Sequence, residues 1–147
     1  MGQLILPSSG NIYIDISVAI YTMEGSPDYY SLLQPLWSKF YAGEIQIISS
    51  ELILMEVLVV PLRNGNNSLV VDYEELLLSS QIRLIPISQS LLKQAANLRA
   101  TTNLKTPDAI HAATALSVNC SQFITNDKGF RNILGLPIAI LNEILES

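Results

Sequence analysis

Short, apolar, β-branched runs alternate along the chain with longer runs that carry helix-start signals, and this alternation restricts the fold more than any other feature. The strand-like runs are residues 11–15, 44–48, 82–87, 122–125 and 137–141. The helical runs are residues 27–41, 50–62, 68–79, 89–101 and 108–118, most of them opened by a Ser or Thr cap. Strands that alternate with helices build a parallel sheet covered on both faces. The sequence therefore predicts an α/β fold with five parallel strands in the doubly wound order 3-2-1-4-5.

Length and composition indicate one domain spanning residues 1–147. The 147 residues are 49% hydrophobic and only 14% charged, which excludes a disordered chain or a coiled coil. The single cysteine, Cys120, excludes a disulfide framework and a cysteine-based metal cluster.

The most apolar window, residues 45–62, raises the question of a membrane. Glu51 and Glu56 interrupt it, and a carboxylate in the middle of a bilayer is costly. The N-terminus has no basic region and only a short apolar run, so no signal peptide is expected. We expect a soluble, cytoplasmic protein without a membrane partner.

Several familiar active sites are excluded because their residues are missing. No glycine lies between Asn11 and Glu24, so the first strand–helix turn is not a dinucleotide- or nucleotide-phosphate loop. No Gly-x-Ser-x-Gly motif is present, and one His and one Cys cannot supply a catalytic triad or a His-rich zinc site. The candidates that remain are carboxylates.

Four carboxylates occupy unusual positions. Asp15 ends an apolar strand, where a doubly wound sheet places its ligand crevice, although a turn residue is an equal alternative. Glu56 has only apolar neighbours at helical spacing. Because a buried, unpaired carboxylate is costly, either that helix face is partly exposed or a positively charged group contacts Glu56. Taken singly, Asp108 and Asp127 are explained by helix capping or a turn.

The four carboxylates are more informative as a group than singly, because the predicted fold places them near one crevice. In the order 3-2-1-4-5, the strand ending at Asp15 neighbours the strand leading to Asp127, and the topological switch point lies between them. Glu56 and Asp108, near the starts of helices at the same edge, can reach this crevice. Carboxylates that converge repel one another unless cations are bound, and Mg²⁺ or Mn²⁺ suits oxygen ligands. Such ions would also offset the net charge of −5, which by itself argues against a nucleic-acid partner.

Four segments in this order resemble the PIN-domain family, specifically the VapC-type toxins of type II toxin–antitoxin pairs. The segments are IDIS (14–17), SELILMEVL (50–58), TPDAIHAATA (106–115) and TNDKGF (125–130). The resemblance implies an acidic catalytic and metal-binding quartet, which is Asp15, Glu56, Asp108 and Asp127. It implies a Mg²⁺- or Mn²⁺-dependent ribonuclease that acts on RNA, forms a homodimer and is silenced by a cognate antitoxin.

Substrate-binding candidates lie on or close to the same segments. They are Ser17, Asn126, Arg63 and Lys128. Basic side chains there could hold phosphates at the rim of the groove, with solubility as the alternative reading. Ser17 matches the small polar residue two positions after the first aspartate of the family, and Phe130 matches an aromatic residue packed beneath the last loop.

The chain departs from the family pattern in two places. Ile16 stands where relatives commonly have Thr or Ser, and residues 1–10 form an N-terminal extension of unknown role. His111, one turn after Asp108, is expected to be a core residue and receives no functional role. Tyr21 and Trp37, on early helices, are expected in core or dimer packing rather than in base stacking.

Two other functional classes remain open. A non-catalytic PIN domain could act as a protein-binding module, and a solitary RNA-processing nuclease would need no antitoxin. A phosphoacceptor receiver domain shares the architecture but needs an aspartate after the third strand, where this chain has Pro86, Ile87 and Ser88.

Overall fold

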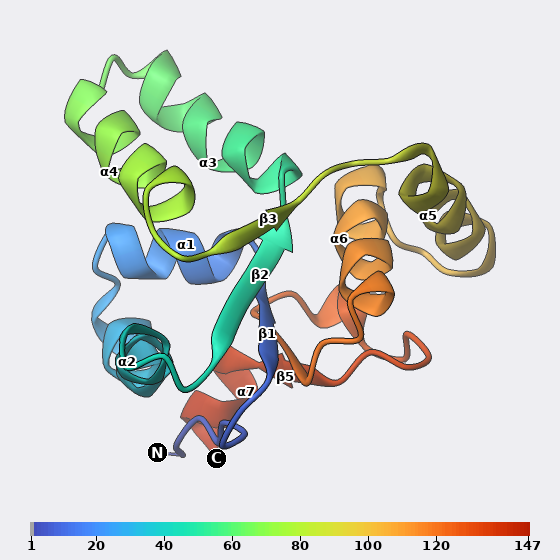
Figure 1. The fold of residues 1–147 in the computed structure, drawn as a ribbon, viewed down its shortest axis with the longest axis horizontal. Coiled ribbons are helices and arrows are strands. Elements are labelled where there is room, and N and C mark those ends of the chain that lie inside the picture. The colour runs from blue at the N-terminus through green and yellow to red at the C-terminus, as the bar shows by residue number, and fades with distance from the viewer. Residues whose placement is uncertain (1) are drawn as a thin grey trace.

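The computed structural model describes residues 2–147 and contains one five-stranded sheet (Figure 1). Its strands are β1 (Asn11–Ile14), β2 (Gln46–Ser50), β3 (Arg83–Ile85), β4 (Gln122–Thr125) and β5 (Ile138–Ile140). They pair in parallel in the order β3-β2-β1-β4-β5. The predicted fold class and strand order are therefore confirmed.

Within residues 2–147, seven α-helices and one short 3-10 helix connect and cover these strands. The helices are α1 (Ile16–Met23), α2 (Pro27–Tyr41), α3 (Leu52–Arg63), α4 (Asn67–Leu78), α5 (Gln89–Thr101), α6 (Thr106–Ser117) and α7 (Leu141–Glu146), and the 3-10 helix η1 is Lys128–Phe130. Figure 1 shows α1 and α2 on one side of the sheet and α5 and α6 on the other.

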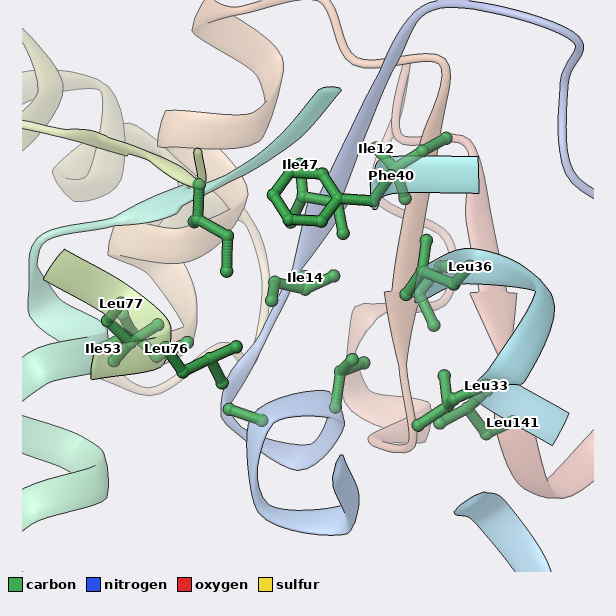
Figure 2. Packing of buried hydrophobic residues seen from close by; sticks show 14 of the residues in the cluster. Ile12, Ile14, Leu33, Leu36, Phe40, Ile47, Ile53, Leu76, Leu77 and Leu141 are labelled. Atoms are coloured by element: carbon green, nitrogen blue, oxygen red, sulfur yellow. The ribbon is translucent and has the colours of Figure 1, made fainter. Parts of the chain in front are cut away.

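Alternate residues of β1 face two separate hydrophobic clusters. Ile12 and Ile14 pack with side chains of α1 to α4 and of α7, as Figure 2 shows for Leu33 and Leu36 of α2. Tyr13, between them, packs in the second cluster with α5 and α6. Because side chains alternate along a strand, a strand buried on both faces is apolar at nearly every position.

The structure corrects the sequence-based element boundaries in four places. Residues 16–23, rich in β-branched side chains, form α1, which we did not anticipate, and residues 141–146 form α7. A regular alternation of strands and helices would place a helix between β4 and β5, but the chain forms only η1 there. Strand β2 starts at residue 46 because the amide of Glu44 still bonds to the carbonyl of Lys39 at the end of α2.

Part of the predicted extension packs onto the domain; its first residue, Met1, lies outside the described residues. Leu4 is buried in the cluster that contains Ile12 and Ile14. The amide of Gly2 donates to the carbonyl of Ile144 in α7. Among residues 2–147, no helix combines the length and the apolarity needed to cross a bilayer.

Candidate active site

The candidate site lies at the carboxyl ends of two neighbouring strands. Asp15 directly follows β1 and Asp127 lies two residues after β4, and β1 and β4 pair in parallel with Ile14 opposite Ile124. Strand order changes direction here, because β2 and β4 lie on opposite sides of β1. The predicted juxtaposition of these two aspartates at the switch point is therefore present in the fold.

Asp15 is almost completely buried, with 4% of its surface exposed. Its Oδ1 accepts hydrogen bonds from the amide of Ser17 at 3.0 Å and from the Ser17 hydroxyl at 2.5 Å. The Thr125 hydroxyl donates to its Oδ2. Burial raises the pKa of Asp15, and the hydrogen bonds from Ser17 and Thr125 oppose that rise. Hydroxyl and amide donors thus hold the carboxylate in place, and no basic side chain of residues 2–147 is bonded to it.

Asp108 is the third residue of α6 and is half-buried. Burial raises its pKa, and the negative charges of Asp127, Glu56 and Asp15 raise it further, while His111 opposes them. Charges act on one another in this way only when they are close. The structure therefore places Asp127, Glu56 and Asp15 within electrostatic reach of Asp108.

Glu56, in the first half of α3, contacts a histidine. His111 Nε2 lies 2.5 Å from Glu56 Oε1, and the ring's Nδ1 lies 2.7 Å from the Tyr13 hydroxyl. The expectation that His111 is buried is confirmed, since only 1% of its surface is exposed. Its contact with Glu56 was not predicted; the sequence indicated only that His111 is three residues after Asp108, on the same helical face.

Ser17 and Asn126, predicted to bind substrate, use their polar groups within the protein. The Ser17 hydroxyl donates to Asp15 and accepts from the amide of Asn126 at 3.1 Å. The Asn126 side chain donates to the Tyr21 hydroxyl at 2.9 Å and accepts from the amide of Asn142 at 2.8 Å. These contacts order the loop between β4 and η1.

The two predicted basic residues are placed differently. Lys128 opens η1 directly after Asp127 and is exposed. Arg63 is the last residue of α3, seven residues beyond Glu56, which places it about 10 Å further along the helix axis. Lys128 therefore lies at the edge of the site, whereas Arg63 lies toward the far end of α3.

The aromatic residue predicted beneath the last loop is in place. Phe130, 1% exposed, packs on Phe123 of β4 with ring centroids 4.8 Å apart. The Asp127 carboxylate accepts from the amide of Gly129 at 2.8 Å, which closes the turn above it. Tyr21 stacks on Tyr29 at 4.3 Å between ring centroids and Trp37 donates to Thr22, in agreement with their expected packing roles.

The donor atoms of the site suit a hard divalent cation. Across residues 2–147, no three His, Cys, Asp or Glu side chains already stand close enough to enclose a metal ion. The four convergent groups nevertheless offer carboxylate oxygens, which Mg²⁺ and Mn²⁺ prefer. Burial and three neighbouring negative charges raise the pKa of Asp108, and a bound cation would relieve both effects. We conclude that the residues present fit such an ion.

Comparisons with known structures agree with this fold. A chain of the VapBC2 complex from Rickettsia felis bound to a promoter DNA fragment superposes with a TM-score of 0.69 at 18% identity, over 88% of this chain and 98% of that chain. A toxin–antitoxin complex from Klebsiella pneumoniae gives 0.64 at 25% identity, over 87% and 95%. The sarcin-ricin loop cleaving toxin VapC20 of Mycobacterium tuberculosis gives 0.63 at 16% identity, over 76% and 86%.

A search of curated proteins returned no match. A family model, in contrast, covers most of the chain: the model described as PIN domain matches residues 12–135. That range begins in β1 and includes Asp15, Glu56, Asp108 and Asp127. The chain belongs to the PIN domain family.

Proposed function

We propose that this protein is a divalent-metal-dependent endoribonuclease, the toxin of a toxin–antitoxin pair that acts in the cytoplasm. The observation that supports the proposal is the placement of the carboxylates: Asp15 and Asp127 follow neighbouring strands at the switch point of the sheet, and both lie, with Glu56, within electrostatic reach of Asp108. Burial and the three neighbouring carboxylates raise the pKa of Asp108. Such mutual repulsion is tolerated where a cation binds, and it is hard to explain in a site without one.

Asp15 and Asp108 would hold a Mg²⁺ or Mn²⁺ ion, with Glu56 and Asp127 completing the acidic set. The ion would stabilise the negative charge that develops on phosphate oxygens during hydrolysis. Ser17 and Thr125 fix the orientation of the Asp15 carboxylate through their hydroxyl groups.

Substrate contacts would come from the basic residues. Lys128, exposed beside Asp127, is suited to hold an RNA phosphate at the edge of the site. Arg63 would contact RNA only where the strand continues along α3. Ser17 and Asn126 would act on substrate indirectly, because their polar groups already order the loop that carries Asp127.

The structural neighbours support the partner classes. The Klebsiella structure is a toxin–antitoxin complex, and VapC20 is a toxin that cleaves the sarcin-ricin loop. We extend both properties to this chain as part of the proposal, together with a functional unit that spans residues 1–147. A homodimer is supported by exposed apolar side chains of α3, where Met55 is 62% and Leu62 60% exposed. Size-exclusion chromatography with light scattering would give a monomer mass if the homodimer is wrong.

The decisive test replaces one carboxylate at a time by its amide. Asp108→Asn and Asp15→Asn are expected to lower RNA cleavage at least about 100-fold, because each removes a negative charge from the active site while keeping the side-chain shape. Cleavage of transcripts is followed by mapping 5′ ends after induction, with circular dichroism to check the fold. Undiminished cleavage by either folded variant would contradict the proposal.

Calorimetric titration with Mn²⁺ separates this proposal from its main alternative. A PIN domain that serves only as a protein-binding module is expected to show no Mn²⁺ site, whereas the proposed nuclease binds the ion in a manner that Asp108→Asn weakens. A solitary RNA-processing nuclease would bind the metal as well, but its gene would lack a neighbouring short reading frame that encodes an antitoxin.

A further inference from the structure

A buried chain of hydrogen bonds runs beneath the acidic site and joins three elements. Tyr13 in β1 contacts His111 in α6 at 2.7 Å, and His111 contacts Glu56 in α3 at 2.5 Å. Each of these elements also carries or leads to a carboxylate of the site: Asp15 follows β1, Asp108 lies in α6, and Glu56 itself lies in α3. The chain therefore connects the three segments whose relative placement defines the site.

The contacts of the ring show which nitrogen donates to Glu56. An ionised carboxylate only accepts hydrogen bonds, so His111 Nε2 must carry the hydrogen that is shared with Glu56 Oε1. The other ring nitrogen, Nδ1, faces the Tyr13 hydroxyl: it accepts the hydroxyl hydrogen in the neutral ring and donates to the hydroxyl oxygen in the imidazolium form. This assignment follows from the network of donors and acceptors. In either form Nε2 donates to Glu56, and the contact between Nδ1 and Tyr13 fixes the orientation of the ring.

Glu56 needs such an orienting partner more than the aspartates do. Its side chain has more rotatable bonds than aspartate, and its neighbours one turn away on α3 include Leu52 and Ile53, which offer no hydrogen bond. The contact with His111 occupies Oε1 and leaves Oε2 available to a ligand. His111 itself has no freedom to move, because it is 1% exposed and lies edge-on to the Tyr13 ring, which stacks on Phe123.

We propose that His111 is a positioning residue, which holds the Glu56 carboxylate in the orientation that a divalent cation requires, and that Tyr13 holds His111 for this task. This inference rests on the proposed nuclease function. Partners that orient a metal-binding carboxylate through a hydrogen bond change metal affinity about 10–100-fold when they are removed. A histidine that merely fills the core would affect stability without that specific loss.

Two amide substitutions distinguish the role of Nε2 of His111 from that of Nδ1. In His111→Gln the side-chain amide reaches the place of Nε2 and can still donate to Glu56. In His111→Asn the amide reaches only the place of Nδ1 and loses Glu56. Both replace the ring by a smaller polar group at the same buried position, so each serves as the matched control for the other. Ser117→Ala, an exposed position on the same helix, controls for nonspecific effects of substitution in α6.

Mn²⁺ affinity is measured by calorimetry and by the metal-induced rise in Tm, with Tm in chelator as the measure of folding. We expect His111→Gln and Ser117→Ala to bind Mn²⁺ within about threefold of the unchanged protein, and His111→Asn to bind about 10–100-fold more weakly. In RNA cleavage, His111→Asn should regain activity at high metal concentration. Equal Mn²⁺ affinity in the Gln and Asn variants, whether both bind normally or both fail, would overturn the proposal.

A measurement on the unchanged protein keeps the inference testable even when neither variant folds. His111 is the only histidine of the chain, so labelling with ¹⁵N-histidine gives the signals of one ring. We expect the Nε2 signal to be that of a protonated nitrogen and both signals to move on titration with Mg²⁺. A ring that lacks the Nε2 hydrogen, or ¹⁵N signals that do not shift when Mg²⁺ binds, would overturn the inference. If the unchanged protein binds neither Mg²⁺ nor Mn²⁺, the proposed function fails instead.

Discussion

Ser17 links the buried carboxylate of the site to the loop that carries Asp127. Its hydroxyl donates to Asp15 and accepts from the amide of Asn126. A buried carboxylate without hydrogen-bond donors would be strongly destabilising. The Ser17 hydroxyl gives Asp15 a donor and gives the amide of Asn126 an acceptor. At this scale the site depends on small polar side chains as much as on the acids themselves.

Ser17→Ala is expected to lower the free energy of unfolding by about 1–2 kcal/mol, since it removes one donor from Asp15 and one acceptor from the amide of Asn126. Asp15 keeps the Ser17 amide and the Thr125 hydroxyl as donors. Cleavage of RNA should therefore fall less than in Asp15→Asn. Urea unfolding and cleavage assays measure the two effects, with Ser117→Ala as the control, and a stability equal to that of the control would count against this role.

Cys120 provides a residue-scale test of burial remote from the acids. Only 7% of it is exposed, and burial raises the pKa of its thiol to about 11 from the usual 9.0. A rise of two pH units lowers the thiolate fraction at pH 8 about 100-fold, and the thiolate is the reactive form. Iodoacetamide should alkylate the folded protein at least that much more slowly than the urea-unfolded protein. Similar rates in both states would show that the thiol is accessible.

At the scale of elements, the connection from α5 to α6 determines where Asp108 lies. Arg99, near the end of α5, donates from Nε to the carbonyl of Leu104 at 3.2 Å and from Nη1 to the Thr106 hydroxyl at 2.8 Å. The Thr102 hydroxyl donates back to the carbonyl of Leu98. These bonds fix the loop that leads into α6, and Asp108 follows two residues after Thr106.

Arg99→Ala should lower the free energy of unfolding by about 1 kcal/mol, a modest value because the guanidinium is exposed to water. It should also reduce RNA cleavage, since the loop before Asp108 loses two donors. Lys93→Ala is the control, because Lys93 is exposed on the same helix. Urea unfolding and cleavage assays on both variants check the effect. If both variants behaved alike, the hydrogen bonds of Arg99 would have no measurable role.

For the whole molecule, the distribution of charge raises the question of how an acidic protein would hold RNA. The formal net charge is −5, and four of the 13 acidic residues converge at the site. Two divalent ions would add four positive charges and leave about −1. Some basic residues are already paired on the surface, as Arg131 is with Glu143 and Lys39 is with Glu44 at 3.3 Å.

RNA binding should therefore depend on the metal. Fluorescence anisotropy of a labelled RNA, recorded early in the reaction, is expected to show binding in Mg²⁺ and at least about tenfold weaker binding in chelator, because the four carboxylates repel phosphate when no cation is present. The same titration at a matched ionic strength of NaCl controls for screening. Tight binding in chelator would contradict this expectation.

Some of these features were predictable because they are local. The alternation of apolar runs with capped helices determined the α/β class, and the doubly wound rule then placed Asp15 and Asp127 at neighbouring strand ends. Element boundaries were less predictable. The β-branched residues of α1 suit a strand as well as a helix. The segment is helical because the Asp15 side chain caps it at the amide of Ser17, and because Val18 and Ala19 pack in the core.

The sequence by itself thus determined the sheet, its order and the four acidic residues at one edge. Only the tertiary structure decided which partners those acids have. Glu56 and His111 are 55 residues apart, and Tyr13 and His111 are 98 apart. No helical or strand periodicity relates positions so distant, because the contact arises only when α3, α6 and β1 pack together. The same packing assigned Ser17 and Asn126 to ordering the site, which their residue types alone could not distinguish from binding substrate.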